Sequence, residues 1–87
     1  MKHFIDFLNA KDVENSPLFA HLKCSKKEAV IIQHLCRKYA KGIEEVSTIE
    51  LITECFETKG YEHINYLEHI KNILDLGWVV QSSFGQI

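Results

Sequence analysis

The chain has 87 residues, enough for one small domain, and its 46% hydrophobic and 25% charged residues are the balance of a globular protein. This composition excludes a disordered chain, and no apolar run approaches the roughly 18 residues that a membrane helix needs. A formal net charge of −2 gives no general attraction to nucleic acid. The N-terminal stretch MKHFIDFLNAKDVE contains no apolar signal-peptide region, so we predict a cytoplasmic protein without membrane contact.

The first half of the chain predicts three helices. Apolar residues favour a short helix over 3–10, and Ser16-Pro17 favours the start of a second helix of about two turns. The third is specified best, because Ser25 and Glu28 have the spacing of a capping box. We expect this helix to run to about residue 40 or 41, with Gly42 as its stop.

The second half predicts two more helices and one strand. Ser47 and Glu50 have the spacing of a second capping box, which predicts a helix over 48–58 that buries Ile49, Ile52, Cys55 and Phe56. A helix over 62–76 follows and ends at Gly77. Its expected buried face consists of His63, Tyr66, Leu67, Ile70, Ile73 and Leu74. The final WVVQSSF run has strand composition. The predicted fold is therefore mainly α, with four to five helices and a short C-terminal β-strand or truncated wing.

A lone strand has no partner within its own chain. We expect Trp78 to pack on the preceding helix near Leu74, and the edge of the strand at 78–83 to pair with a second copy as a homodimer. Because a return strand is missing, we interpret residues 1–87 as a single domain that is the N-terminal piece of a longer protein. The alternative is a complete small helical protein that ends in an unstructured tail.

The stretch Val46–Ser83 resembles winged helix-turn-helix domains. The resemblance rests on Glu50-Leu51-Ile52 in the middle helix and on the phrase IKNILDLGWV, residues 70–79. It implies a winged-helix-like domain that serves either as a DNA reader or as a protein docking module. The turn ETKGYEH is longer than the tight turn of that family. The whole chain also resembles the non-catalytic N-terminal region of bacterial AAA-type ATPases, which implies an ATPase domain downstream, although these residues contain no P-loop motif.

The solvent face of the helix over 62–76 would be the one that enters a DNA groove if this chain read DNA. Asn65 and Asn72 on its solvent face could pair with adenine. Lys71, however, is the only fixed positive charge there, against Glu68 and Asp75. This face repels phosphate, so we expect no specific DNA binding by the helix.

Charge is distributed unevenly along the chain. Residues 23–42 carry six Lys or Arg and one Glu, a net charge of +5, and residues 43–57 carry five Glu, a net charge of −5. A helical wheel places one basic stripe on the third helix, and its members are our candidate partner-binding residues: Lys26, Lys27, Val30, His34, Arg37, Lys38 and Lys41. The stripe is either a solvated face or a docking face for an acidic partner or a nucleic-acid backbone. Val30 among the charges favours a protein.

Metal binding and catalysis find little support. His34 and Cys36 belong to the H-x-C half of a zinc-like pattern, but on a helix they point about 200° apart. No spacing unites a nucleophile with a base, and three irregularly spaced cysteines predict free thiols. We therefore predict a non-catalytic protein-interaction or regulatory module without a cofactor, from a larger bacterial protein such as an AAA-type ATPase. A DNA-binding transcriptional regulator is the alternative.

Overall fold

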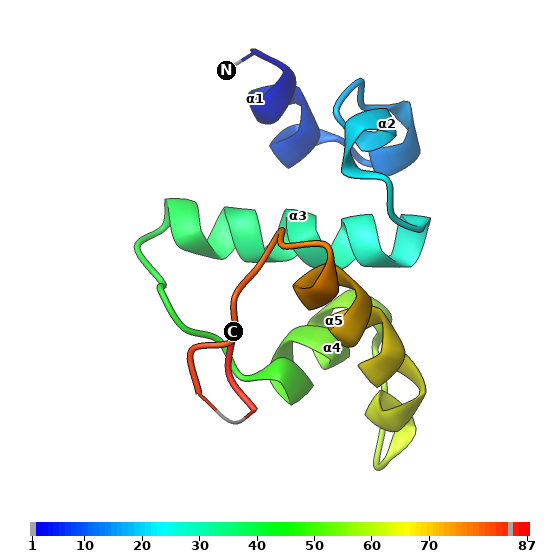
Figure 1. Cartoon of the computed structure of the whole chain (residues 1–87), viewed down its shortest axis with the longest axis vertical. Coiled ribbons are helices and arrows are strands. Elements are labelled where there is room, and N and C mark those ends of the chain that lie inside the picture. The colour runs from blue at the N-terminus through cyan, green and yellow to red at the C-terminus, as the bar shows by residue number, and fades with distance from the viewer. Residues whose placement is uncertain (1, 84) are drawn as a thin grey trace.

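The computed structural model describes residues 2–83 and 85–87 and is mainly helical, as predicted (Figure 1). The described chain contains α1 (Lys2–Asn9), the 3-10 helix η1 (Val13–Asn15), α2 (Phe19–Leu22), α3 (Lys26–Ala40), α4 (Thr48–Phe56), the 3-10 helix η2 (Glu62–Tyr66) and α5 (Leu67–Asp75). Helix α3 is the central element. In Figure 1, α1 and α2 lie on one side of it, and α4, α5 and the C-terminal segment lie on the other.

Local sequence signals set both ends of α3, as predicted. The Glu28 N–H donates to Ser25 Oγ (3.2 Å) and the Ser25 N–H donates to Glu28 Oε1 (3.1 Å), which completes the capping box. At the other end Gly42 has a φ of 87°, in the left-handed region. The N–H of Ile43 then reaches the Lys38 carbonyl (3.0 Å), so the last turn closes as a Schellman motif.

Helix α5 ends in the same way at Gly77. The Gly77 N–H donates to the Leu74 carbonyl (3.0 Å) and the Trp78 N–H to the Ile73 carbonyl (3.2 Å), with Gly77 at a φ of 82°. Gly77→Ala should lower the free energy of unfolding by about 1 kcal/mol, because a Cβ disfavours this conformation. No neighbouring atom would touch that Cβ, so the cost is conformational. Urea titration measures it, and Gly77→Asn should recover part of the loss because asparagine tolerates left-handed φ. Equal stability of all three proteins would contradict this assignment.

Helix α3 is covered on more sides than a two-faced wheel allows. Ala29, Ile31 and Ile32 are buried in the core. Gln33 is buried too, and its Nε2 donates to the carbonyl oxygens of Phe7 (2.7 Å) and Ala10 (2.9 Å), which ties α3 to the end of α1. Helix α3 therefore has neighbours on more than one of its sides.

The packing of α4 and α5 corrects two predicted faces. Leu51 and Ile52 of α4 and Ile70 and Ile73 of α5 are buried. Ile49, expected in the core, is 51% exposed, and Leu67 is exposed as well. The rest of both predicted apolar faces agrees with the structure: Ile52 is buried, and Cys55, Phe56, Tyr66 and Leu74 pack against the core. Residues 62–66 form a 3-10 helix, so the helix predicted over 62–76 divides into two elements.

The predicted C-terminal strand is wrong: no strand forms among the described residues. The chain bends after Gly77, and only isolated antiparallel bridges follow, Ser47 with Gln86 and Ser83 with Gln86. Val46 and Ile87 exchange two backbone hydrogen bonds (2.7 and 3.0 Å), and the Thr48 N–H donates to the Gly85 carbonyl (2.9 Å). The second capping box is also wrong, since the Ser47 side chain makes no cap bond.

Candidate functional site: an apolar groove

The structure divides the predicted basic stripe between opposite sides of α3. On the side of α1 and η1, Lys26 Nζ lies 3.6 Å from Asp12 and 3.2 Å from Glu14. Arg37 Nε donates to the Leu8 carbonyl oxygen at 2.7 Å. Both cations therefore hold the N-terminal elements against α3.

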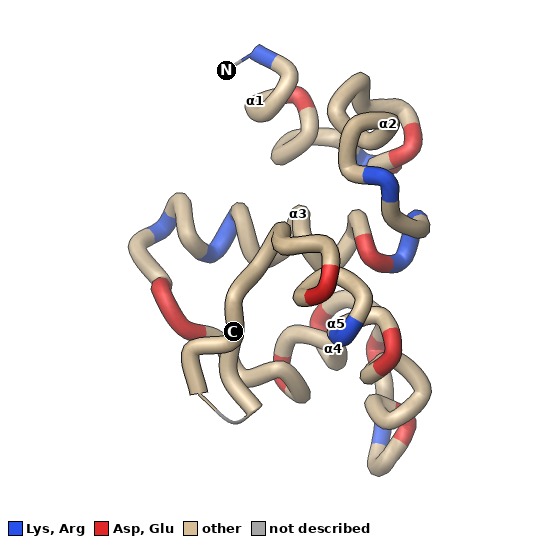
Figure 2. Tube along the Cα trace, in the orientation of Figure 1, with Lys and Arg blue, Asp and Glu red and all other residues tan. Residues whose placement is uncertain are grey.

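The remaining stripe residues face elsewhere. Lys38 Nζ lies 2.9 Å from Glu54 of α4, and Lys27 Nζ lies 5.3 Å from the centre of the Tyr66 ring, a cation–π distance. Val30 packs against the core, and its carbonyl oxygen accepts a hydrogen bond from His34 Nδ1 (3.0 Å). Lys41 is exposed at the end of α3. In Figure 2 the basic segments of α3 lie at its two ends, so the seven residues do not form one continuous surface.

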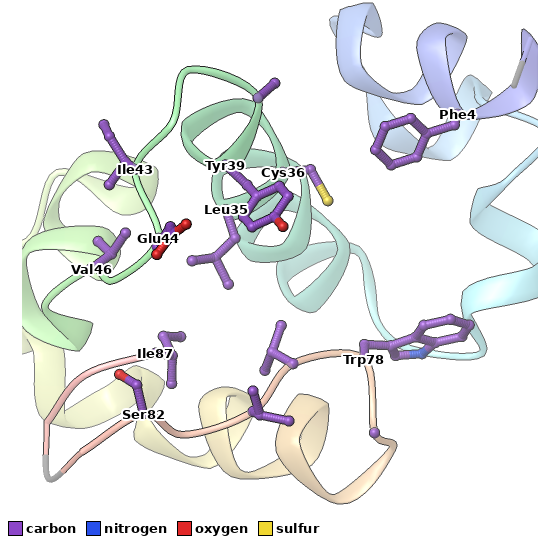
Figure 3. Close-up of a pocket in the computed structure, with 14 residues that line it drawn as sticks. Phe4, Leu35, Cys36, Tyr39, Ile43, Glu44, Val46, Trp78, Ser82 and Ile87 are labelled. Carbon is purple, nitrogen blue, oxygen red and sulfur yellow. The ribbon is translucent and has the colours of Figure 1, made fainter.

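An apolar groove of about 580 Å³ lies between the C-terminal half of α3 and the segment that follows α5 (Figure 3). We call it the apolar groove. It is lined by Phe4, Leu35, Cys36, Tyr39, Ala40, Ile43, Glu44, Val46, Gly77, Trp78, Val79, Val80, Ser82 and Ile87. Its volume falls within the range of ligand-binding pockets, and it has the expected composition of mostly apolar side chains with few polar ones.

Large apolar side chains of this groove stay in contact with water. Tyr39 is 71% exposed, Val80 is 78% exposed and Trp78 is 47% exposed, and Phe4 and Ile43 are exposed as well. The two glycine caps explain the arrangement, because each reverses the chain and delivers the next apolar residue, Ile43 or Trp78, to the groove. The sequence pattern did not lead us to predict this site. The signal that could have indicated it is an apolar residue directly after each helix-ending glycine, Ile43 after Gly42 and Trp78 after Gly77.

Trp78 connects the C-terminal segment to the end of α2. Its Nε1 donates to the Leu22 carbonyl oxygen (2.8 Å) at the end of α2. The indole is half exposed and reaches across to the N-terminal elements, whereas we expected it packed down on α5 near Leu74. The expected cost of Trp78→Ala therefore falls below that of a core aromatic residue.

The thiols of this chain are poor nucleophiles. Cys24, Cys36 and Cys55 are free, as predicted, and each is half-buried. Burial raises the pKa of Cys36, which lines the groove, and burial together with the Glu28 charge raises the pKa of Cys24. Burial and the charge of Glu54, partly offset by Lys38, raise the pKa of Cys55 to about 12. All three thiols stay protonated at neutral pH.

A buried carboxylate joins α3 to α5. Glu28 Oε2 accepts hydrogen bonds from His69 Nδ1 (2.6 Å) and Asn72 Nδ2 (3.1 Å). Burial acts to raise the pKa of Glu28, but the hydrogen bonds from His69, Asn72 and the Ser25 N–H outweigh it and hold the pKa below its ordinary value. The side-chain amide of Asn72, which we expected could pair with adenine, therefore makes its hydrogen bond within the protein.

Because Asn72 already has a partner within the protein, we expect still less DNA binding by α5. The exposed residues of α5 include Glu68, Lys71 and Asp75, a net charge of −1. In a gel-shift assay at physiological salt, duplex DNA should bind no tighter than about 10⁻⁶ M and without sequence preference. The reason is that the exposed face of α5 carries too few cations to bind the phosphates on either side of a DNA groove. Selection from randomised duplexes should yield no consensus. Sub-micromolar binding that depends on sequence would contradict this prediction.

The described residues contain no cluster of three or more His, Cys, Asp or Glu side chains placed to hold a metal ion. Within the same residues, none of the helices combines the length and the apolar character needed to cross a membrane. Comparison of the chain with protein families, with curated proteins and with solved structures gave no match.

Proposed function

We propose that this chain is a non-catalytic protein-interaction module whose apolar groove binds an apolar segment of a partner protein. The observation that carries the proposal is the exposure of Phe4, Tyr39, Ile43, Trp78 and Val80 around one groove. All five side chains are exposed, and all five line the same groove. Exposed apolar side chains gathered at one place on a protein are typical of an interaction site.

A winged-helix type of module is the fold class that we propose. Two features support it. The first is the order of elements, in which α3, α4 and α5 are followed by a C-terminal segment. The second is that the residues just before α4 pair with the end of that segment, through Val46 and Ile87. This pairing has the place of the small sheet that closes a winged helix, although it is reduced to isolated bridges. The resemblance to the region ahead of bacterial AAA-type ATPases suggests a larger protein as its setting. The full reading frame of the gene tests this, since such a protein encodes a P-loop motif downstream.

Selection of binding peptides from a random display library tests the proposed function. We expect selected peptides to be apolar and to change the fluorescence of Trp78, which lies in the groove. Tyr39→Ser should weaken their binding about tenfold or more, because a tyrosine at the centre of a contact contributes strongly. Tyr61→Ser is the matched control, since Tyr61 is exposed outside the groove.

Two further variants locate the binding site. Val80→Asp places a charge in the apolar groove and should abolish binding, whereas Lys41→Glu should have little effect. The opposite pattern, with binding lost in Lys41→Glu and kept in Val80→Asp, would move the partner to the basic end of α3 and contradict the groove as its site.

A further inference from the structure

His69 of α5 presents one ring nitrogen to a buried carboxylate and the other to water. Its Nδ1 lies 2.6 Å from Oε2 of Glu28, whose side chain is only 7% exposed, whereas the His69 side chain is 26% exposed. Among the residues that the structure describes, Nε2 of His69 makes no hydrogen bond, and no buried side-chain nitrogen or oxygen lacks a partner. The Nε2 atom is therefore in contact with solvent.

The state of Glu28 decides which ring nitrogen of His69 carries the proton. Although burial opposes the charge, hydrogen bonds hold the pKa of Glu28 below its ordinary value, so this carboxylate is ionised at neutral pH. An ionised carboxylate only accepts hydrogen bonds, so Nδ1 is the donor. In the neutral imidazole the lone pair then lies on Nε2. Asn72 Nδ2 and the Ser25 N–H, each 3.1 Å from a Glu28 oxygen, hold the carboxylate in this position.

A carboxylate behind an imidazole makes the opposite ring nitrogen more reactive. The same arrangement orients the histidines of many metal sites and catalytic triads. When Nε2 forms a bond to an electrophile, the ring becomes positively charged, and a carboxylate next to Nδ1 stabilises that charge. The chain has five histidines. Within the described residues His69 alone bonds to a carboxylate, because His34 Nδ1 bonds to the Val30 carbonyl oxygen instead (3.0 Å).

The possible uses of such a nitrogen differ in what else they require. A metal ion needs further ligands, and no three His, Cys, Asp or Glu side chains gather in the described part of the chain. A general base needs a substrate held within its reach, and His69 does not line the apolar groove. A nucleophile that accepts a group from an incoming donor needs only an accessible lone pair. The position of Nε2 meets this last requirement.

The charges near His69 suit a phosphoryl group. Glu68 and Lys71 are both exposed on α5 and offset each other. A further cation comes from α3: Lys27 Nζ lies 5.3 Å from the centre of the Tyr66 ring, which itself lies 6.3 Å from the centre of the His69 ring. Lys27 is exposed, and its flexible side chain can turn from the aromatic ring towards an added anion. A phosphoryl group would bring about two negative charges to this place.

We propose that His69 is a phosphoryl-acceptor site, at which Nε2 takes a phosphoryl group from a phosphoramidate donor. The Nε2 lone pair forms the new bond to phosphorus. The phosphorus–nitrogen bond of the donor breaks, and its electron pair leaves with the amine of the donor. The proton on Nδ1 stays in its hydrogen bond to Glu28, which acts as a positioning residue. This site is separate from the apolar groove and does not depend on what the groove binds.

Incubation of the folded protein with phosphoramidate tests the site, with the other histidines as internal controls. Peptide mass spectrometry under non-acidic conditions follows the reaction at each histidine, and phosphorus NMR distinguishes the Nε2 product from the Nδ1 product. We expect His69 to react at Nε2 about tenfold faster than His21, the usual size of a carboxylate's effect on the histidine it orients. His21 is the more exposed of the two, so exposure alone predicts the opposite order. A rate at His69 equal to or below that of His21, or reaction at Nδ1, would overturn the proposal.

Two glutamate variants test the role of the bonded carboxylate. Glu28→Gln should slow the reaction at His69 about tenfold, to the rate of His21. Glu68→Gln is the matched control, because Glu68 neighbours His69 in the chain but is exposed, and it should leave the rate unchanged. Equal rates in the parent protein and in folded Glu28→Gln, or an equal loss in both variants, would overturn the proposal. If circular dichroism shows that Glu28→Gln is unfolded, the comparison of His69 with His21 in the parent protein decides.

Discussion

Glu28→Ala is expected to lower the free energy of unfolding by about 2–4 kcal/mol, a large part of the stability of a small domain. The Glu28 carboxylate is buried and takes part in two functions at once. It completes the capping box of α3 through the Ser25 N–H, and it accepts hydrogen bonds from His69 and Asn72 of α5. Its removal leaves these donors without their partner and opens a gap between two helices.

Acid titration tests the same group without deleting it. The ordinary pKa of this glutamate is 4.5, and in the folded chain burial, which raises it, is outweighed by the three hydrogen bonds, so the folded pKa is lower. A lowered pKa means that ionised Glu28 contributes stability above pH 4.5, and that this contribution is lost as pH falls through the folded pKa.

Urea denaturation between neutral and acidic pH measures the effect. Glu28→Gln should lose stability at neutral pH and show a flatter decline below pH 4.5. Glu50→Gln, at an exposed position of α4, is the control and should keep the decline of the parent protein. If Glu28→Gln declines as steeply as the parent, the buried carboxylate is not the group that titrates.

Leu51→Ala is expected to lower the free energy of unfolding by about 2–5 kcal/mol, the range for large-to-small changes in a core. Leu51 is fully buried where α4 packs against α3, and an 87-residue domain has few such residues to spare. The variant should therefore melt well below the parent protein or remain partly unfolded at 25 °C.

Ile49→Ala on the same helix is the matched control for Leu51→Ala. Ile49 is 51% exposed, so its truncation should change stability by no more than about 0.5 kcal/mol. Thermal unfolding followed by circular dichroism compares the two. An equal loss in both variants would mean that Ile49 packs in the core, as the sequence pattern had predicted.

The sequence by itself determined the local features of this protein. Ser25 and Glu28 mark the start of α3, and Gly42 and Gly77 mark the stops of α3 and α5, because each signal acts on backbone groups within one turn of a helix. The mainly helical class and the free cysteines follow from composition and spacing in the same way. These properties depend on neighbours along the chain, which a single sequence displays.

Only the tertiary structure decided which faces meet. Gln33 and Arg37 bond to carbonyl groups of α1, 26 and 29 residues away, and Glu28 bonds to His69, 41 residues away. A helical wheel sorts residues into two faces, but α3 has neighbours on several sides, so its basic stripe was divided among them. The apolar groove likewise gathers Phe4, Tyr39 and Trp78 from distant parts of the chain. Such contacts are set by how helices stack, and hydrophobic burial is non-directional, so periodicity along one helix does not specify them.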